Sequence, residues 1–139
     1  MYMKTEEFNI SVEMNAKYVN KSIYEEGRMM MVEWLIQQIG SDDENIYWTG
    51  SQTDLAELVY YLYEKQLMRD GFGYPLSYRC LVKQCFAFFH VTEPTNPFTI
   101  AARARRRKGI KQPSLLERFC WMHFRAGKIR PLDDEVVVI

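Results

Sequence analysis

The chain has 139 residues, of which 47% are hydrophobic and 14% aromatic, and 18 basic side chains balance 18 acidic ones. This length and composition are typical of one folded domain and exclude an intrinsically disordered protein. An odd count of three cysteines, without a signal-peptide pattern, predicts reduced thiols and a cytoplasmic location. The longest apolar runs, such as Met29–Val32, fall far short of the ~20 residues that span a bilayer, so no membrane partner is expected.

The N-terminal third is predicted to contain a strand and a helix. Apolar residues at every second position across residues 8–14 (FNISVEM) predict a half-buried strand. A mostly apolar stripe over residues 17–39 predicts a helix that Gly27 interrupts. At the other end, the β-branched run Val136–Ile139 is either a second strand that pairs with the first or a frayed tail.

Residues 46–130 are predicted to form a helical core. Ser51 and Asp54 have the spacing of a capping box and open a helix over residues 52–68. Glu57, Glu64 and Lys65 lie off its apolar stripe and are expected to be solvated. Further helices are predicted over residues 76–91, over 97–108 after the Asn96-Pro97 signal, and from Pro113 to Gly127.

Three compact helices with short links, the third of them basic, have the layout of a helix-turn-helix unit. We therefore predict a mainly α, helix-turn-helix or winged-helix-like protein, in which a small terminal strand pair and a frayed tail are the two alternatives for the ends. The single domain would span residues 1–139, with an N-terminal strand and helix (1–45), the core (46–130) and an acidic-apolar tail (131–139).

The neutral total charge hides a segregation along the chain. Residues 1–98 carry 14 acids and 8 bases, residues 99–130 carry ten bases and one acid, and residues 131–139 carry three acids and no base. Segregated charge is an argument about partners rather than about fold. The partner that best matches one concentrated basic face is a polyphosphate backbone.

The basic residues at the end of the predicted helix 97–108 are the candidate nucleic-acid contacts. Arg103, Arg106 and Arg107 have the spacing i, i+3 and i+4 and are predicted to face the groove, because the arginine fork can bond a phosphate or a guanine edge at two points. The flanking phosphates would then be held by Arg105, Lys108 and Lys111. Two alternatives remain: a solvated basic face paired with the acidic N-terminal half of the chain, and a face that binds an acidic protein.

The cysteines and histidines do not predict a metal site. Cys80, Cys85 and His90 diverge around a helix, and Cys120 with His123 supplies only two ligands of the four that a tetrahedral site needs. Phosphate-loop, nucleotide-fold and hydrolase signatures are absent from the sequence. We therefore expect no metal, no cofactor and no enzyme activity.

One segment resembles a known family. Trp48-Thr49-Gly50-Ser51-x-Thr53-Asp54-Leu55-x-Glu57-Leu58-x-Tyr60 resembles the W-T-G-S-x-T-x-L-x-E-L-x-Y segment of the RteC family, regulators associated with conjugative transposons of gut anaerobes. That family's later signature, R-K, a further base and then F-L-D, is similar to Arg107-Lys108, Lys111 and Leu115-Leu116-Glu117. The resemblance covers about residues 46–125.

The resemblance implies a winged-helix-like DNA-binding domain in a transcriptional regulator of mobile-element genes. Arg107, Lys108 and Lys111 would be DNA contacts, and Trp48–Tyr60 would be scaffold. The alternative is a degenerate RteC-like paralogue, or another protein-interaction module, that uses the basic face for an acidic protein. RNA as the nucleic acid also remains open.

Overall fold

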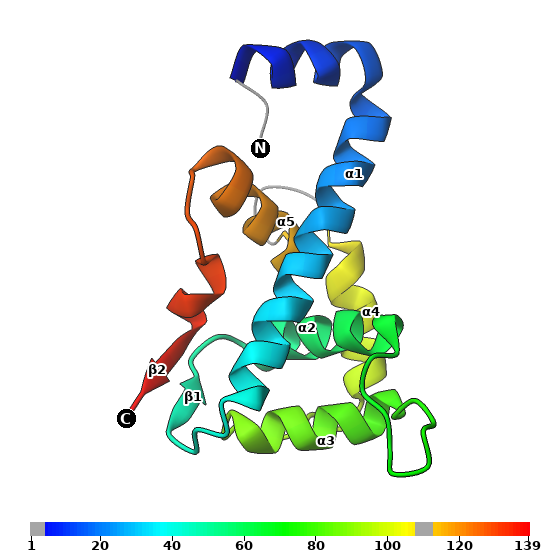
Figure 1. Ribbon diagram of the computed structural model, residues 1–139, viewed down its shortest axis with the longest axis vertical. Coiled ribbons are helices and arrows are strands. Elements are labelled where there is room, and N and C mark those ends of the chain that lie inside the picture. Colours follow the sequence, from blue (N-terminus) through cyan, green and yellow to red (C-terminus); the bar gives the residue numbers. More distant parts are fainter. Residues whose placement is uncertain (1–4, 108–112) are drawn as a thin grey trace.

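The computed structural model describes the backbone of residues 5–107 and 113–139, and the side chains of residues 21–107 and 113–139. The fold is mainly helical with one small sheet, which confirms the predicted class (Figure 1). The α-helices of the described residues are α1 (Thr5–Gly40), α2 (Gln52–Lys65), α3 (Tyr78–Phe88), α4 (Pro97–Arg106) and α5 (Leu115–Cys120). The other elements are the strands β1 (Ile46–Trp48) and β2 (Val136–Val138), the π-helix η1 (Trp121–Arg125) and the 3-10 helix η2 (Pro131–Glu135).

The strand predicted over residues 8–14 is wrong, because this stretch belongs to α1. Its alternation also places Phe8 with Val12, and Ile10 with Met14, at i and i+4, which is a helical spacing. Gly27 is the only residue between Thr5 and Ile39 that strongly disfavours a helix, so little in the local sequence opposes a continuous one.

A terminal strand does form, with a different partner. β2 pairs antiparallel with β1, in the register Ile46 to Val138 and Trp48 to Val136. The ladder continues through the N–H of Thr49, which donates to the carbonyl of Glu135 at 2.7 Å. The sheet therefore joins the segment that precedes α2 to the end of the described chain.

α2 and α4 begin at the predicted residues, α3 and α5 begin two residues later than predicted, and α2, α3 and α5 end earlier. The side chains of Ser51 and Ser77 cap α2 and α3, and the Ser51 hydroxyl accepts the N–H of Asp54, which is one of the two bonds of the predicted capping box. Gln66 ends α2 in the left-handed region, at φ 52°. Residues 89–96 link α3 to α4, a longer connection than the three- or four-residue turn of a helix-turn-helix unit.

Three aromatic rings from separate elements form part of the hydrophobic core. Trp34 of α1 stacks on Phe89 with ring centroids 6.2 Å apart, and Trp48 of β1 packs against Phe89 at 5.8 Å. The indole N–H of Trp34 also donates to Asp133 of η2 at 2.8 Å. The segment predicted as a tail is therefore docked on the core, in which its residue Leu132 is buried.

Gly27 allows α1 and α5 to pack closely. A Cβ atom built at Gly27 would lie 2.6 Å from Sγ of Cys120, closer than unstrained packing tolerates. The glycine that lowers helix propensity in α1 thus has a packing role.

Candidate nucleic-acid interface

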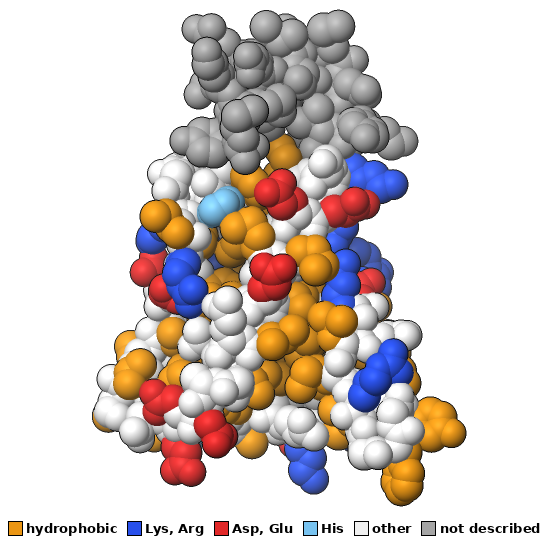
Figure 2. Space-filling view, viewed as in Figure 1, with side chains coloured by type: hydrophobic (Ala, Val, Ile, Leu, Met, Phe, Trp, Pro, Cys, Tyr) orange, Lys and Arg blue, Asp and Glu red, His pale blue; other side chains and the backbone are white. Residues whose placement is uncertain are grey.

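The predicted basic cluster lies at the C-terminal end of α4. Arg103 and Arg106 are exposed there, and Nε of Arg106 donates to the carbonyl of Ala102 at 3.2 Å. Arg107 is the C-cap of α4 (φ −61°, ψ 123°), so the helix ends at this predicted contact. Lys108 and Lys111 lie outside the described residues. Figure 2 shows Lys and Arg side chains recurring down the edge of the molecule where Figure 1 places α4.

Arg105 differs from its neighbours because it packs inward. Its guanidinium carbon lies 3.5 Å from the centroid of the Tyr60 ring on α2. Its Nε is buried without a hydrogen-bond partner among the described residues. A guanidinium over an aromatic face is held by a cation–π interaction, so Arg105 anchors α4 to α2. We predicted a phosphate contact at this position, and the packing favours a structural role.

The sequence did not single out Arg28, which lies on the same side of the molecule. Burial raises the pKa of Tyr61, and the charges of Arg28 on α1 and Arg105 on α4 both oppose that rise. The two guanidinium groups therefore lie within electrostatic reach of one hydroxyl. No acid of the described residues forms an ion pair with Arg28, Arg103, Arg106 or Arg107. The sequence gave no reason to single out Arg28, because it is an isolated base among the acids of α1.

The C-terminal bases of the segment are instead paired with acids. Arg118 on α5 contacts Asp54 at 2.5 Å and Glu135 at 3.9 Å. Lys128 pairs with Asp134, and Arg130 pairs with Asp133 at 2.9 Å. Of these acids, Asp54 belongs to the acidic N-terminal part of the chain, whereas Asp133, Asp134 and Glu135 belong to the C-terminal tail. Unpaired positive charge among the described bases of the segment is concentrated on α4 and Arg107.

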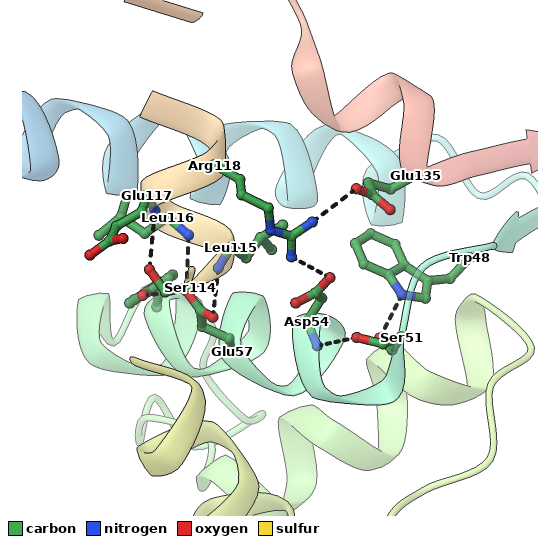
Figure 3. A network of polar contacts seen from close by, with 11 residues as sticks. Trp48, Ser51, Asp54, Glu57, Ser114, Leu115, Leu116, Glu117, Arg118 and Glu135 are labelled. Carbon is green, nitrogen blue, oxygen red and sulfur yellow. Dashed lines mark hydrogen bonds and ion pairs between the residues drawn. The ribbon is translucent and has the colours of Figure 1, made fainter. Parts of the chain in front are cut away.

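The expectation that Glu57 is solvated is wrong. Its side chain is fully buried and accepts the backbone N–H groups of Leu115 at 2.9 Å and Leu116 at 3.0 Å, together with the hydroxyl of Tyr61 at 2.7 Å. Burial raises the pKa of this carboxyl, although the three hydrogen bonds oppose the rise. Figure 3 shows the carboxylate directly below the first turn of α5. Glu57 therefore fixes the start of α5, which follows the basic residues in the chain.

Trp48, Gly50, Ser51 and Asp54 of the W-T-G-S segment have structural roles. The Trp48 indole donates to the carbonyl of Ser51 at 3.0 Å, and the Ser51 hydroxyl accepts the N–H of Asp54 at 3.0 Å (Figure 3). Asp54 in turn pairs with Arg118. A Cβ atom at Gly50 would lie 2.6 Å from Oε2 of Glu135. The segment therefore joins α2, α5 and the end of η2, which is a scaffold role.

Two further findings concern other kinds of site. Within residues 21–107 and 113–139, no group of three or more His, Cys, Asp and Glu side chains is placed to hold a metal ion. No helix in the described part of the chain combines the length and the apolar character needed to cross a bilayer.

Comparison with known proteins gives no relative. No protein-family model matches the chain, and no curated protein and no solved structure is significantly similar to it. The similarity to the RteC family consequently rests on the residues quoted above, and the function is argued from the surface of the molecule.

Proposed function

We propose that this protein is a non-enzymatic, DNA-binding transcriptional regulator that contacts the phosphate backbone through the basic end of α4. The observation that supports the proposal most directly is the exposure of Arg103 and Arg106 without an acidic partner among the described residues. Arginines held apart from carboxylates keep their charge available for phosphate oxygens. Such a regulator would act in the cytoplasm.

The scaffold around α4 supports this assignment. Arg105 fixes the helix against Tyr60, and the buried alanines Ala101 and Ala104 let α4 pack closely on its neighbours. Rigid elements position binding groups more accurately than loops do. Arg28 would widen the positive surface across α1.

The RteC-like segment leads us to propose further that the regulated genes belong to a mobile element. In this proposal Arg107, Lys108 and Lys111 add DNA contacts beyond the helix, as the resemblance implies. An acidic protein partner and RNA are the competing outcomes that binding experiments must separate.

The test compares two double variants that each remove two positive charges from the same basic segment. Arg103→Gln with Arg106→Gln removes unpaired charges, whereas Lys128→Gln with Arg130→Gln removes bases paired with Asp134 and Asp133. Fluorescence anisotropy with a 30-base-pair duplex should show weaker binding for the first variant and a log–log salt slope shallower by about 1.8, since each phosphate contact contributes roughly 0.9. The second variant should bind like wild type. Equal binding by all three proteins would refute the assignment to α4.

A further inference from the structure

A cavity of about 810 Å³ opens between α1, α5 and η1. Its volume falls in the range of about 300–1,000 Å³ that is usual for small-molecule sites. Ile23 and Tyr24 line it from α1, and Cys120, Trp121 and Phe124 line it from α5 and η1. Its lining residues include none of α4, so the proposed DNA contacts do not account for it. Figure 2 shows apolar side chains with acidic ones among them on this face of the molecule.

One wall of the cavity is a π-helix. The α-helical pattern of α5 gives way to η1 at Trp121, and η1 supplies Trp121, Met122, Phe124 and Arg125 to the lining. π-helical turns are rare and occur frequently at functional sites. The Trp121 side chain is 61% exposed, although an indole of this size is normally well covered in a folded protein. The wall thus presents a large aromatic surface that the rest of the described chain does not cover.

The lining of the cavity holds one carboxylate that forms no ion pair with the described residues. Both arginines in its lining are engaged, because Arg118 pairs with Asp54 and Glu135 and Arg125 has an interaction of its own. Glu117, by contrast, forms no ion pair with any described residue. Burial raises the pKa of the Tyr24 hydroxyl, and the charge of Glu117 raises it further. The Glu117 carboxylate therefore lies close to the aromatic wall on α1.

We infer that this cavity binds an apolar organic cation. The aromatic faces of Tyr24, Trp121 and Phe124 would hold the positive charge by cation–π interactions, and the Glu117 carboxylate would balance it. Cys120 and Ile23 would cover the apolar body of the ligand, because removing hydrocarbon surface from water is favourable. An apolar anion would leave Glu117 facing a like charge, so we expect it to bind more weakly than a cation.

Two ions of matched shape and opposite charge test the inference. Tetraphenylphosphonium and tetraphenylborate differ chiefly in charge, so isothermal titration calorimetry of the full chain with each isolates the electrostatic contribution. We expect saturable binding of one phosphonium per chain and at least about tenfold weaker binding of the borate, a difference of about 1.4 kcal/mol. Equal affinities, preference for the borate or no saturable binding of the phosphonium would overturn the inference.

Two variants then locate the site. Glu117→Gln keeps a residue that can still complete a capping box with Ser114, and it should weaken phosphonium binding several-fold. Trp121→Ala removes an exposed side chain and should weaken binding as well without unfolding the protein. Glu64→Gln, a change of the same kind at an exposed position on α2, should leave the affinity unchanged. Wild-type affinity in both cavity variants would place the ligand elsewhere and contradict the assignment.

Discussion

The carboxylate of Glu57 on α2 accepts the backbone N–H of Leu115, 58 positions later in the chain, at 2.9 Å. A second N–H, that of Leu116, donates to the same carboxylate at 3.0 Å. Helix N-termini leave N–H groups without intrahelical partners, and here a side chain from another helix supplies the acceptors. The chain is thereby fixed on both sides of the undescribed basic stretch, by Arg105 before it and by Glu57 after it.

Replacement of Glu57 by Gln should destabilise the fold. A Gln side chain keeps one acceptor oxygen but turns donor hydrogens toward the groups that the other oxygen accepted, and an unsatisfied buried donor costs about 1–3 kcal/mol. We expect the free energy of unfolding to fall by roughly 2–4 kcal/mol, measured by urea denaturation at pH 7. Glu64→Gln on the exposed side of α2 should change it by less than about 0.5 kcal/mol. Similar losses in both variants would contradict the capping role.

The difference in unfolding free energy between wild type and the Glu57→Gln variant should depend on pH in one direction. Burial holds the pKa of Glu57 above its ordinary value of 4.5 in the folded protein, so the folded state binds this proton more tightly than the unfolded state does. The contribution of Glu57 to stability is therefore largest below the unfolded pKa and declines as the pH rises through the folded pKa. The stability difference between wild type and E57Q should be larger at pH 4 than at pH 7. A larger difference at pH 7 would show that the hydrogen bonds outweigh burial.

Substitution of Gly27 by Ala tests the close approach of α1 and α5. Alanine has the higher helix propensity by about 1 kcal/mol, yet its Cβ would lie 2.6 Å from Sγ of Cys120. We expect a net loss of roughly 1–3 kcal/mol of unfolding free energy, as is typical of overpacking. Gly40→Ala, where the new methyl group meets nothing within 4 Å, should be neutral or stabilising. A stabilised G27A protein would mean that the two helices separate readily.

Arg105 should contribute to stability more than to nucleic-acid binding. Arg105→Gln removes the guanidinium from the Tyr60 ring, and a buried cation–π contact is worth about 1–2 kcal/mol. Thermal unfolding of the variant should therefore begin at a lower temperature, while the salt slope of duplex binding should stay close to that of wild type. A slope shallower by about 0.9, the loss of one phosphate contact, with unchanged stability, would instead make Arg105 a phosphate contact.

The three thiols should react at different rates. Burial raises the pKa of Cys85 and of Cys120 to about 12, whereas Cys80 is partly exposed. Because the thiolate is the reactive form, Ellman's reagent at pH 8 should label about one thiol rapidly in the native protein and all three in urea. Cys80→Ser should abolish the rapid phase. Rapid labelling of two thiols in that variant would show that the core around Cys85 or Cys120 opens.

Local patterns were sufficient to predict α2, α3 and α4, because each is opened by a cap or a proline within the same few residues. The strand at Val136–Val138 was also indicated by its β-branched residues. Its pairing with β1 could not be predicted from local patterns. The two strands lie far apart in the sequence, and the packing of the helices between them decides whether they meet.

The site was predictable in outline only. The excess of bases identified the segment, but the sequence could not separate exposed Arg103 from Arg118, whose partner Asp54 lies 64 positions earlier. Glu57 was misjudged for the same reason, because its hydrogen-bond donors belong to a distant helix. Long-range contacts decide which charges remain available to a ligand.

The measurement that tests the central claim most directly is a titration of labelled 30-base-pair duplex with the full chain across a salt series. Four to six phosphate contacts predict that binding weakens linearly in log salt with a slope of about −3.6 to −5.4. Loss of about two contacts in the variant with Arg103→Gln and Arg106→Gln would then assign that slope to α4. Absence of binding even at low salt would contradict the account and direct attention to acidic protein partners.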